Sequence, residues 1–138
     1  MSSSPKPSTL LVCTRCLAAG ADPAAPRAGA ALLAAARAAA AEDCVIRVVG
    51  VACLSGCKRA CTAALMAPRK VGYLFGDLPP DAEGAADLLA VARAHSARAD
   101  GFLPRAERPE RLRAGILARI PPLNWIPSEP QETIAWPA

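Results

Sequence analysis

The fold is organised around Val51-Ala-Cys-Leu-Ser-Gly-Cys-Lys-Arg-Ala-Cys-Thr-Ala-Ala-Leu65 in this chain of 138 residues. This stretch carries three thiols, Cys53, Cys57 and Cys61, at two successive four-residue steps. A second pair lies upstream, at Cys13 and Cys16, in a Cys-Thr-Arg-Cys run. The CxxC spacing is typical of two sulfurs that chelate one metal or form a disulfide. Together the two clusters predict a metal site.

Composition limits the classes of protein to which this chain can belong. Its length suits one domain, and its 53% hydrophobic content, much of it alanine, predicts a small-residue, aliphatic core. The net charge of +4 comes from scattered basic residues, which indicates a solvated surface and argues against a nucleic-acid site. No apolar run approaches the ~18 residues of a membrane span. The N-terminal stretch also lacks the apolar core of a secretory signal. We therefore expect a cytoplasmic protein that binds neither nucleic acid nor a membrane.

The first half of the chain predicts a βαβ unit. Residues 9–13 form an apolar run that predicts a buried strand, and residues 28–42 have the alanine and leucine content of a helix. Residues 44–53 are β-branched and predict a second strand. A right-handed crossover makes these strands parallel and brings their C-terminal ends to one edge of the sheet. The two cysteine clusters should therefore converge.

The next segments predict a hairpin and a second helix. Two short apolar runs, 62–66 and 71–75, are separated by a turn and form an expected β-hairpin. Asp81 can cap a helix over residues 82–98, because its carboxylate can accept hydrogen bonds from the first free N–H groups. The fold class is therefore α/β.

Three regions follow from this reading of the chain. Residues 1–8 are expected to be an N-terminal tail, residues 9–103 the folded domain, and residues 104–138 an extension. In the extension, Pro109 can open a short helix that runs to Ile120. A proline-rich tail follows this helix.

Five residues outside the main cysteine clusters are given structural roles. Cys44, at the start of a strand, is expected to be a small buried hydrophobe. Tyr73 and Phe75 alternate along a strand and should lie in the core on one side of the sheet. Trp125 and Trp136 should dock onto the body of the protein.

Two sets of motifs carry a resemblance to known families. Cys-Leu-Ser-Gly-Cys at residues 53–57, at a strand end and followed by a hairpin and a helix, resembles the thioredoxin-like [2Fe-2S] ferredoxins and the small subunit of respiratory complex I. The chain from Val12 to Leu123, including Tyr-Leu-Phe-Gly-Asp-Leu and Ala-Arg-Ile-Pro-Pro-Leu, is more closely similar to a bacterial family labelled "predicted metal-binding protein". Genes of that family often accompany cobalamin biosynthesis. The resemblance implies a thioredoxin-like fold with a proline-rich C-terminal extension.

The resemblance also implies a ligand set for a [2Fe-2S] cluster. It assigns Cys53 and Cys57 to the CxxxC pair and Cys13 to the ligand in the first loop. Cys16 is the expected fourth ligand, because each of two short loops then gives two sulfurs. Cys61 is the alternative fourth ligand.

These assignments predict a ferredoxin-like electron carrier that serves a redox partner protein, with cobalamin biosynthesis as a candidate pathway. A catalyst is not expected, because the sequence has one histidine and no nucleophile–base set. Two alternatives stay open: a thiolate protein or metallochaperone for zinc or cobalt, and a thiol-disulfide oxidoreductase. The oligomeric state is also open, with a homodimer as one option.

Overall fold

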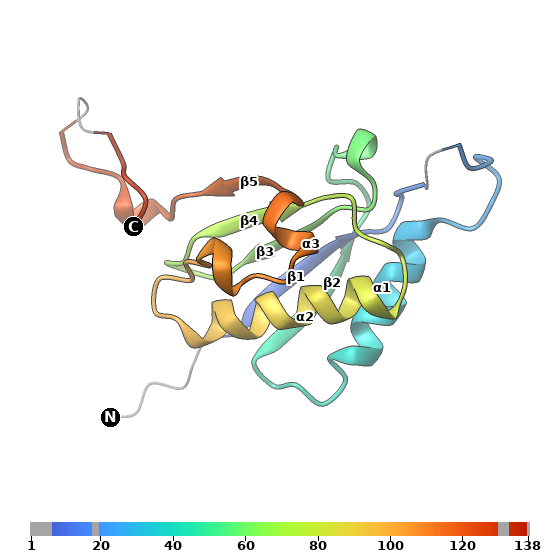
Figure 1. Cartoon of the computed structure of the whole chain (residues 1–138), viewed down its shortest axis with the longest axis horizontal. Helices are drawn as coiled ribbons and strands as arrows, with labels where there is room; N and C mark the ends of the chain where they lie inside the picture. The colour runs from blue at the N-terminus through green and yellow to red at the C-terminus, as the bar shows by residue number, and fades with distance from the viewer. Residues whose placement is uncertain (1–6, 18–19, 130–132, 138) are drawn as a thin grey trace.

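The computed structural model describes residues 7–17, 20–129 and 133–137. These residues form a mixed α/β structure built on one five-stranded sheet (Figure 1). Along the chain the elements are β1 (Ser8–Cys13), α1 (Ala28–Ala39), β2 (Ile46–Val51), the short helix η1 (Cys57–Arg59), β3 (Ala63–Met66), β4 (Gly72–Phe75), α2 (Ala82–Ala97), the short helix η2 (Arg105–Glu107), α3 (Arg111–Ala114), β5 (Ile116–Ile120) and the short helix η3 (Leu123–Trp125).

The sheet has the strand order β2-β1-β3-β4-β5. Strands β1 and β2 are parallel, and α1 connects them, so the predicted βαβ unit is confirmed. Strands β3 and β4 form the predicted antiparallel hairpin, and β3 also runs antiparallel to β1. In the parallel register Cys13 lies beside Val51, so the chain leaves both strands at the same edge of the sheet.

Helices α1 and α2 lie on the same face of the sheet. Leu33 of α1 packs so closely on Gly50 of β2 that a Cβ there would lie 2.9 Å from Leu33 Cδ2. Gly50 pairs with Val12 of β1, and on the same side of β1 the Ser8 hydroxyl bonds to His95 of α2. The apolar core therefore fills the space between these two helices and one side of the sheet.

His95 is a buried structural residue at the end of α2. Its Nε2 lies 2.7 Å from the Val71 carbonyl oxygen, which can only accept, and its Nδ1 lies 2.7 Å from Ser8 Oγ. A neutral ring satisfies both contacts, and burial lowers the pKa of His95 despite the opposing effect of the Val71 carbonyl. Lys70 Nζ donates at 2.9 Å to the carbonyl oxygens of His95 and Ser96, so it caps the C-terminus of α2.

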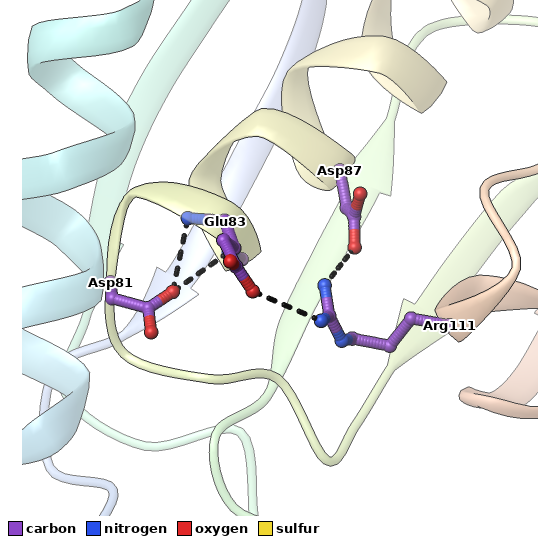
Figure 2. Close-up of polar contacts among 5 residues, drawn as sticks. Asp81, Glu83, Asp87 and Arg111 are labelled. Atoms are coloured by element: carbon purple, nitrogen blue, oxygen red, sulfur yellow. Dashed lines mark hydrogen bonds and ion pairs between the residues drawn. The ribbon is translucent and has the colours of Figure 1, made fainter.

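The start of α2 is capped as the sequence predicts. The Asp81 carboxylate accepts hydrogen bonds from the Glu83 N–H at 3.0 Å and the Gly84 N–H at 3.1 Å (Figure 2). Arg111, which begins α3, pairs with Asp87 and with Glu83 on the exposed side of α2 (Figure 2). The two ion pairs hold α3 against the first turns of α2.

The predicted helix over residues 109–120 is wrong beyond Ala114. Helix α3 is a single turn that ends at Gly115, and residues 116–120 instead form β5, antiparallel to β4. Without β5, strand β4 would end the sheet with unpaired N–H and C=O groups. Pairing with β5 satisfies the groups along that free edge of β4, which a further helical turn at residues 116–120 would leave unpaired.

The predicted positions of the aromatic residues are confirmed: Tyr73 and Phe75 lie in the core, and Trp125 and Trp136 pack against it. Tyr73 and Phe75 are buried and stack with their ring centroids 5.9 Å apart. Trp136 stacks on Phe102 at 6.3 Å and meets Trp125 edge-on at 5.9 Å. The C-terminal segment that the structure describes therefore packs onto the domain, while residues 130–132 and 138 of the predicted tail lie outside the described part.

Within residues 7–17, 20–129 and 133–137, none of the helices combines the length and the apolar content that crossing a membrane requires.

Candidate thiolate site

The two cysteine loops meet at one edge of the sheet. The N–H of Thr14 donates to the Val51 carbonyl at 2.8 Å, and the N–H of Cys13 donates to the Thr62 carbonyl at 3.1 Å. The first loop therefore begins between the end of β2 and the residue that follows Cys61. In Figure 1 the loop after β1 and the loop that carries η1 leave this same edge. The predicted convergence of the loops is confirmed, while the use of their thiols as ligands stays a prediction.

Cys13 lies in surroundings that favour its thiolate. Its side chain is buried, which by itself would raise the pKa. The backbone N–H of Leu54, the N–H groups of Arg15 and Cys16 and the Cys16 side chain act in the opposite direction, and the pKa of Cys13 is lowered as a result. Several N–H donors directed at one sulfur are typical of thiolates that bind a metal or attack a disulfide.

Cys16 and Cys61 are buried next to Cys13, and we call these three residues the thiol trio. Burial raises the pKa of Cys16, although the hydroxyl of Thr62, 3.5 Å from its sulfur, acts to lower it. Burial also raises the pKa of Cys61, to about 11, with added contributions from the charges of Cys16 and Cys13. Burial therefore favours the protonated thiols of Cys16 and Cys61, and a bound cation would stabilise their thiolates.

Cys53 and Cys57 lie on the adjoining loop and are exposed. The N–H of Ser55 donates to Cys53 Sγ at 3.2 Å, so this sulfur also has a backbone donor. Gly56 approaches Thr62 so closely that a Cβ would lie 2.6 Å from Thr62 Cγ2. The loop therefore folds back toward the trio, because Thr62 is also the partner of the Cys16 sulfur.

The donor set fits a soft-metal or iron–sulfur centre in chemistry. All five residues offer sulfur, and the sulfurs of Cys13, Cys16 and Cys53 already have N–H or O–H neighbours that stabilise negative charge. In the part of the chain that the structure describes, no group of three or more His, Cys, Asp or Glu side chains has the arrangement of a metal site. The structure nevertheless buries Cys13, Cys16 and Cys61 next to one another, and Cys53 and Cys57 lie on the adjoining loop at the surface.

The comparisons place the chain in a family without assigning it a reaction. One family model, described as "Protein of unknown function (DUF1636)", matches residues 10–122. The chain belongs to DUF1636. The matched range contains all six cysteines and every strand, apart from the first two residues of β1. Comparison of this DUF1636 chain with curated proteins and with solved structures gives no match.

Some residues of the DUF1636 site could not be found from cysteine spacing. Gly29 in the first turn of α1 donates its N–H to the Cys16 carbonyl at 3.0 Å, and a Cβ there would lie 2.1 Å from the Cys13 carbonyl oxygen. The only indication of this close contact in the sequence is that Gly29 is the one glycine of an alanine-rich helix. Leu54 and Thr62 contribute through backbone and hydroxyl groups, for which no spacing rule exists.

The structural role predicted for Cys44 is wrong, because its side chain is exposed. Strand β2 begins only at Ile46, and Cys44 lies in the preceding turn. The Asp43 carboxylate accepts the Val45 N–H at 3.1 Å in this turn, which delays the start of the strand. Cys44 is therefore an exposed thiol at the opposite end of β2 from the candidate site.

Proposed function

We propose that this protein is a ferredoxin-like electron carrier that holds a [2Fe-2S] cluster through thiolates at the carboxyl edge of its sheet. The observation that carries the proposal is the convergence of five cysteines on two adjoining loops, with backbone N–H groups directed at the sulfurs of Cys13 and Cys53. The βαβ unit, hairpin and helix, in the strand order β2-β1-β3-β4, support a thioredoxin-like fold. In this proposal residues 104–138, which include α3 and β5, form a C-terminal extension.

The proposed ligands are Cys13, Cys16, Cys53 and Cys57, with Cys61 as the alternative to Cys16. Cys13 is supported by its lowered pKa and its three backbone donors. The place of Cys61 in the buried trio strengthens its claim, because it lies close enough to Cys16 and Cys13 to be affected by their charges. Whichever of Cys16 and Cys61 is not a ligand would remain beside the centre.

When bound, a [2Fe-2S] cluster supplies one-electron chemistry. The N–H groups of Leu54 and Ser55 would stabilise negative charge on the ligand sulfurs, which raises the reduction potential. Arg59 contributes less to this, because Asp77 binds its guanidinium Nε at 2.8 and 3.0 Å. Lys58 has no ion pair among the described residues, so it is the free cation that η1 offers to an acidic redox partner.

A thiol-disulfide oxidoreductase is the second candidate, and a specific observation favours it. In the Cys13-Thr-Arg-Cys16 motif the pKa of the first thiol is lowered and that of the second is raised. A reactive first thiol and a protonated second thiol suit disulfide exchange. Both side chains are only 3% exposed, however, which leaves little access for a substrate disulfide.

Anaerobic purification followed by absorption spectroscopy and metal analysis tests the proposal. We expect a visible spectrum and about two iron and two labile sulfide ions per chain. One zinc or cobalt ion with no sulfide would instead identify a mononuclear thiolate site. A metal-free protein with a reversible Cys13–Cys16 disulfide would identify the oxidoreductase.

Serine variants then test the ligand set. Cys53→Ser and Cys57→Ser should each abolish or strongly weaken the visible spectrum. Cys44→Ser is the matched control, because it removes one exposed thiol at the far end of β2. A Cys57→Ser protein with an unchanged spectrum would contradict the assignment.

A further inference from the structure

The face of the sheet opposite α1 and α2 is largely apolar, with Arg47 of β2 as a charged residue on it. Side chains alternate between the two faces of each strand, so the residues between the core positions form rows on this open face. One row crosses all the strands in register and contains Val49, Leu11, Ala64, Leu74 and Ala118. Met66 and Ile120, near the end of the sheet farther from the thiols, are 52% and 59% exposed. Apolar side chains in an unbroken row are unusual on a face that water reaches.

Part of this face is hollowed into a cavity of about 700 Å³. Its floor is formed by β3 and β4, and its wall by the end of β5 and the Pro-Pro-Leu segment that follows. The principal apolar lining residues are Leu54, Ala64, Met66, Leu74, Ile120 and Leu123. This volume lies within the range of small-molecule sites, which are mostly apolar with a few polar groups that orient the ligand.

Among the residues that the structure describes, the charged lining of the cavity is entirely basic. Arg69 and Lys70 line it, and no Asp or Glu of the described ranges does. The Lys70 amino group is already bonded to the end of α2, whereas Arg69 is exposed and has no ion pair in the described part of the chain. Arg69 is therefore the cation available to an occupant of the cavity.

Arg69 also has a backbone conformation that favours a different residue. It occupies the third position of the Ala67–Lys70 turn with φ of +63°, where glycine or asparagine is preferred. A large side chain held in the left-handed region is a local strain that stability alone does not explain. The turn places this arginine at the rim of the cavity.

Leu54 connects the cavity with the candidate thiolate site. Its side chain forms part of the cavity wall, while its N–H is directed at the Cys13 sulfur. A molecule in the cavity would therefore contact the loop that carries Cys53 and Cys57.

We propose that the cavity binds a small apolar molecule with one anionic group, such as an aromatic or aliphatic carboxylate. The apolar part lies on Ala64, Met66 and Leu74, and the anion pairs with Arg69. The cavity volume, the apolar lining and the single available cation carry this proposal, which does not depend on what the thiols hold.

Two fluorescent probes that differ by one charge test it on the full-length protein. Anilinonaphthalene sulfonate has an apolar ring system and an anionic group, and N-phenylnaphthylamine has the same rings without the sulfonate. Both should bind, and decanoate should displace both. Arg69→Gly relieves the strained conformation, so it should fold at least as well as the wild type. It should weaken sulfonate binding about fivefold, as the loss of one solvent-exposed ion pair predicts, and leave binding of the neutral probe unchanged.

Arg37→Gln is the matched control, because it removes one exposed positive charge from α1, on the other side of the sheet from the cavity. It should leave the affinity for both probes unchanged. Equal weakening of sulfonate binding by Arg69→Gly and Arg37→Gln would overturn the pairing, and failure of both probes to bind would overturn the site. Sedimentation as a dimer that the probes dissociate would show that a second copy of the chain covers this face, which would also overturn the proposal.

Discussion

Gly29→Ala tests the link between α1 and the first cysteine loop. In most helices this substitution stabilises by about 1 kcal/mol, because alanine loses less backbone entropy than glycine. Here the new Cβ would lie 2.1 Å from the Cys13 carbonyl oxygen and 3.0 Å from the Cys16 nitrogen. Backbone atoms cannot turn aside as the end of a side chain can, so the helix and the loop must separate.

The expected cost follows from the contacts that separation removes. Overpacking at a rigid contact costs about 1–3 kcal/mol. Lengthening the 3.0 Å hydrogen bond from Gly29 to the Cys16 carbonyl adds about 1 kcal/mol. With the gain in helix propensity subtracted, we expect the free energy of unfolding to fall by about 1–3 kcal/mol, or roughly 3 °C in the melting temperature per kcal/mol.

Gly84→Ala provides a matched control on α2. Its Cβ would lie 2.1 Å from the Pro79 carbonyl oxygen, so it has the same clash in the first turn of a helix. The segment that it presses on bonds to Cys61 through Leu78, and the clash does not involve the backbone of Cys13 or Cys16. Both variants should lose similar stability in urea denaturation followed by circular dichroism. Only Gly29→Ala should change the rate at which Cys13 and Cys16 react with a thiol reagent. A Gly29→Ala protein as stable as the wild type, or equal changes in thiol reactivity in both variants, would refute the reasoning.

Three further predictions concern other parts of the molecule. Cys16→Ser should lower cluster occupancy or shift the EPR signal more than Cys61→Ser, and the reverse order would make Cys61 the fourth ligand. Burial lowers the pKa of His95 below its ordinary 6.5, so the unfolded chain binds more protons than the folded one, and the free energy of unfolding should fall as the pH drops below about 6.5. His95→Gln should remove most of this pH dependence. An equally steep pH profile in the variant would assign the dependence to another group. Trp136→Ala should lower the free energy of unfolding by about 1–2 kcal/mol, because the half-buried indole packs on the Phe102 ring and its centroid lies 4.3 Å from the Arg119 guanidinium carbon. An unchanged urea midpoint would show that these contacts contribute nothing to stability.

Local pattern was sufficient to predict the βαβ unit, the hairpin and α2. The β-branched run at residues 46–51 favours a strand at its own position, and the Asp81 carboxylate caps the helix that begins at the next residue. Both effects involve only residues that are close together in the sequence. Strand β5 could not be predicted in this way, because Ile116-Leu-Ala-Arg-Ile120 contains residues that are also good helix formers. Its conformation is decided by the free edge of β4, which is distant in sequence and becomes available only after the hairpin has formed.

The same division between local and distant causes applies to the thiols. Chain topology places all five clustered cysteines at one edge of the sheet, and this follows from where the parallel strands end. Their burial does not follow from spacing. Cys57 lies four residues after Cys53, and Cys61 lies four residues after Cys57, yet Cys57 is exposed and Cys61 is buried. The difference arises because the residue after Cys61 pairs with Cys13 in the sheet, whereas Cys57 begins the short helix η1 outside it. Spacing therefore identifies which residues can be ligands, and the start of β3 decides which of them is buried beside Cys13.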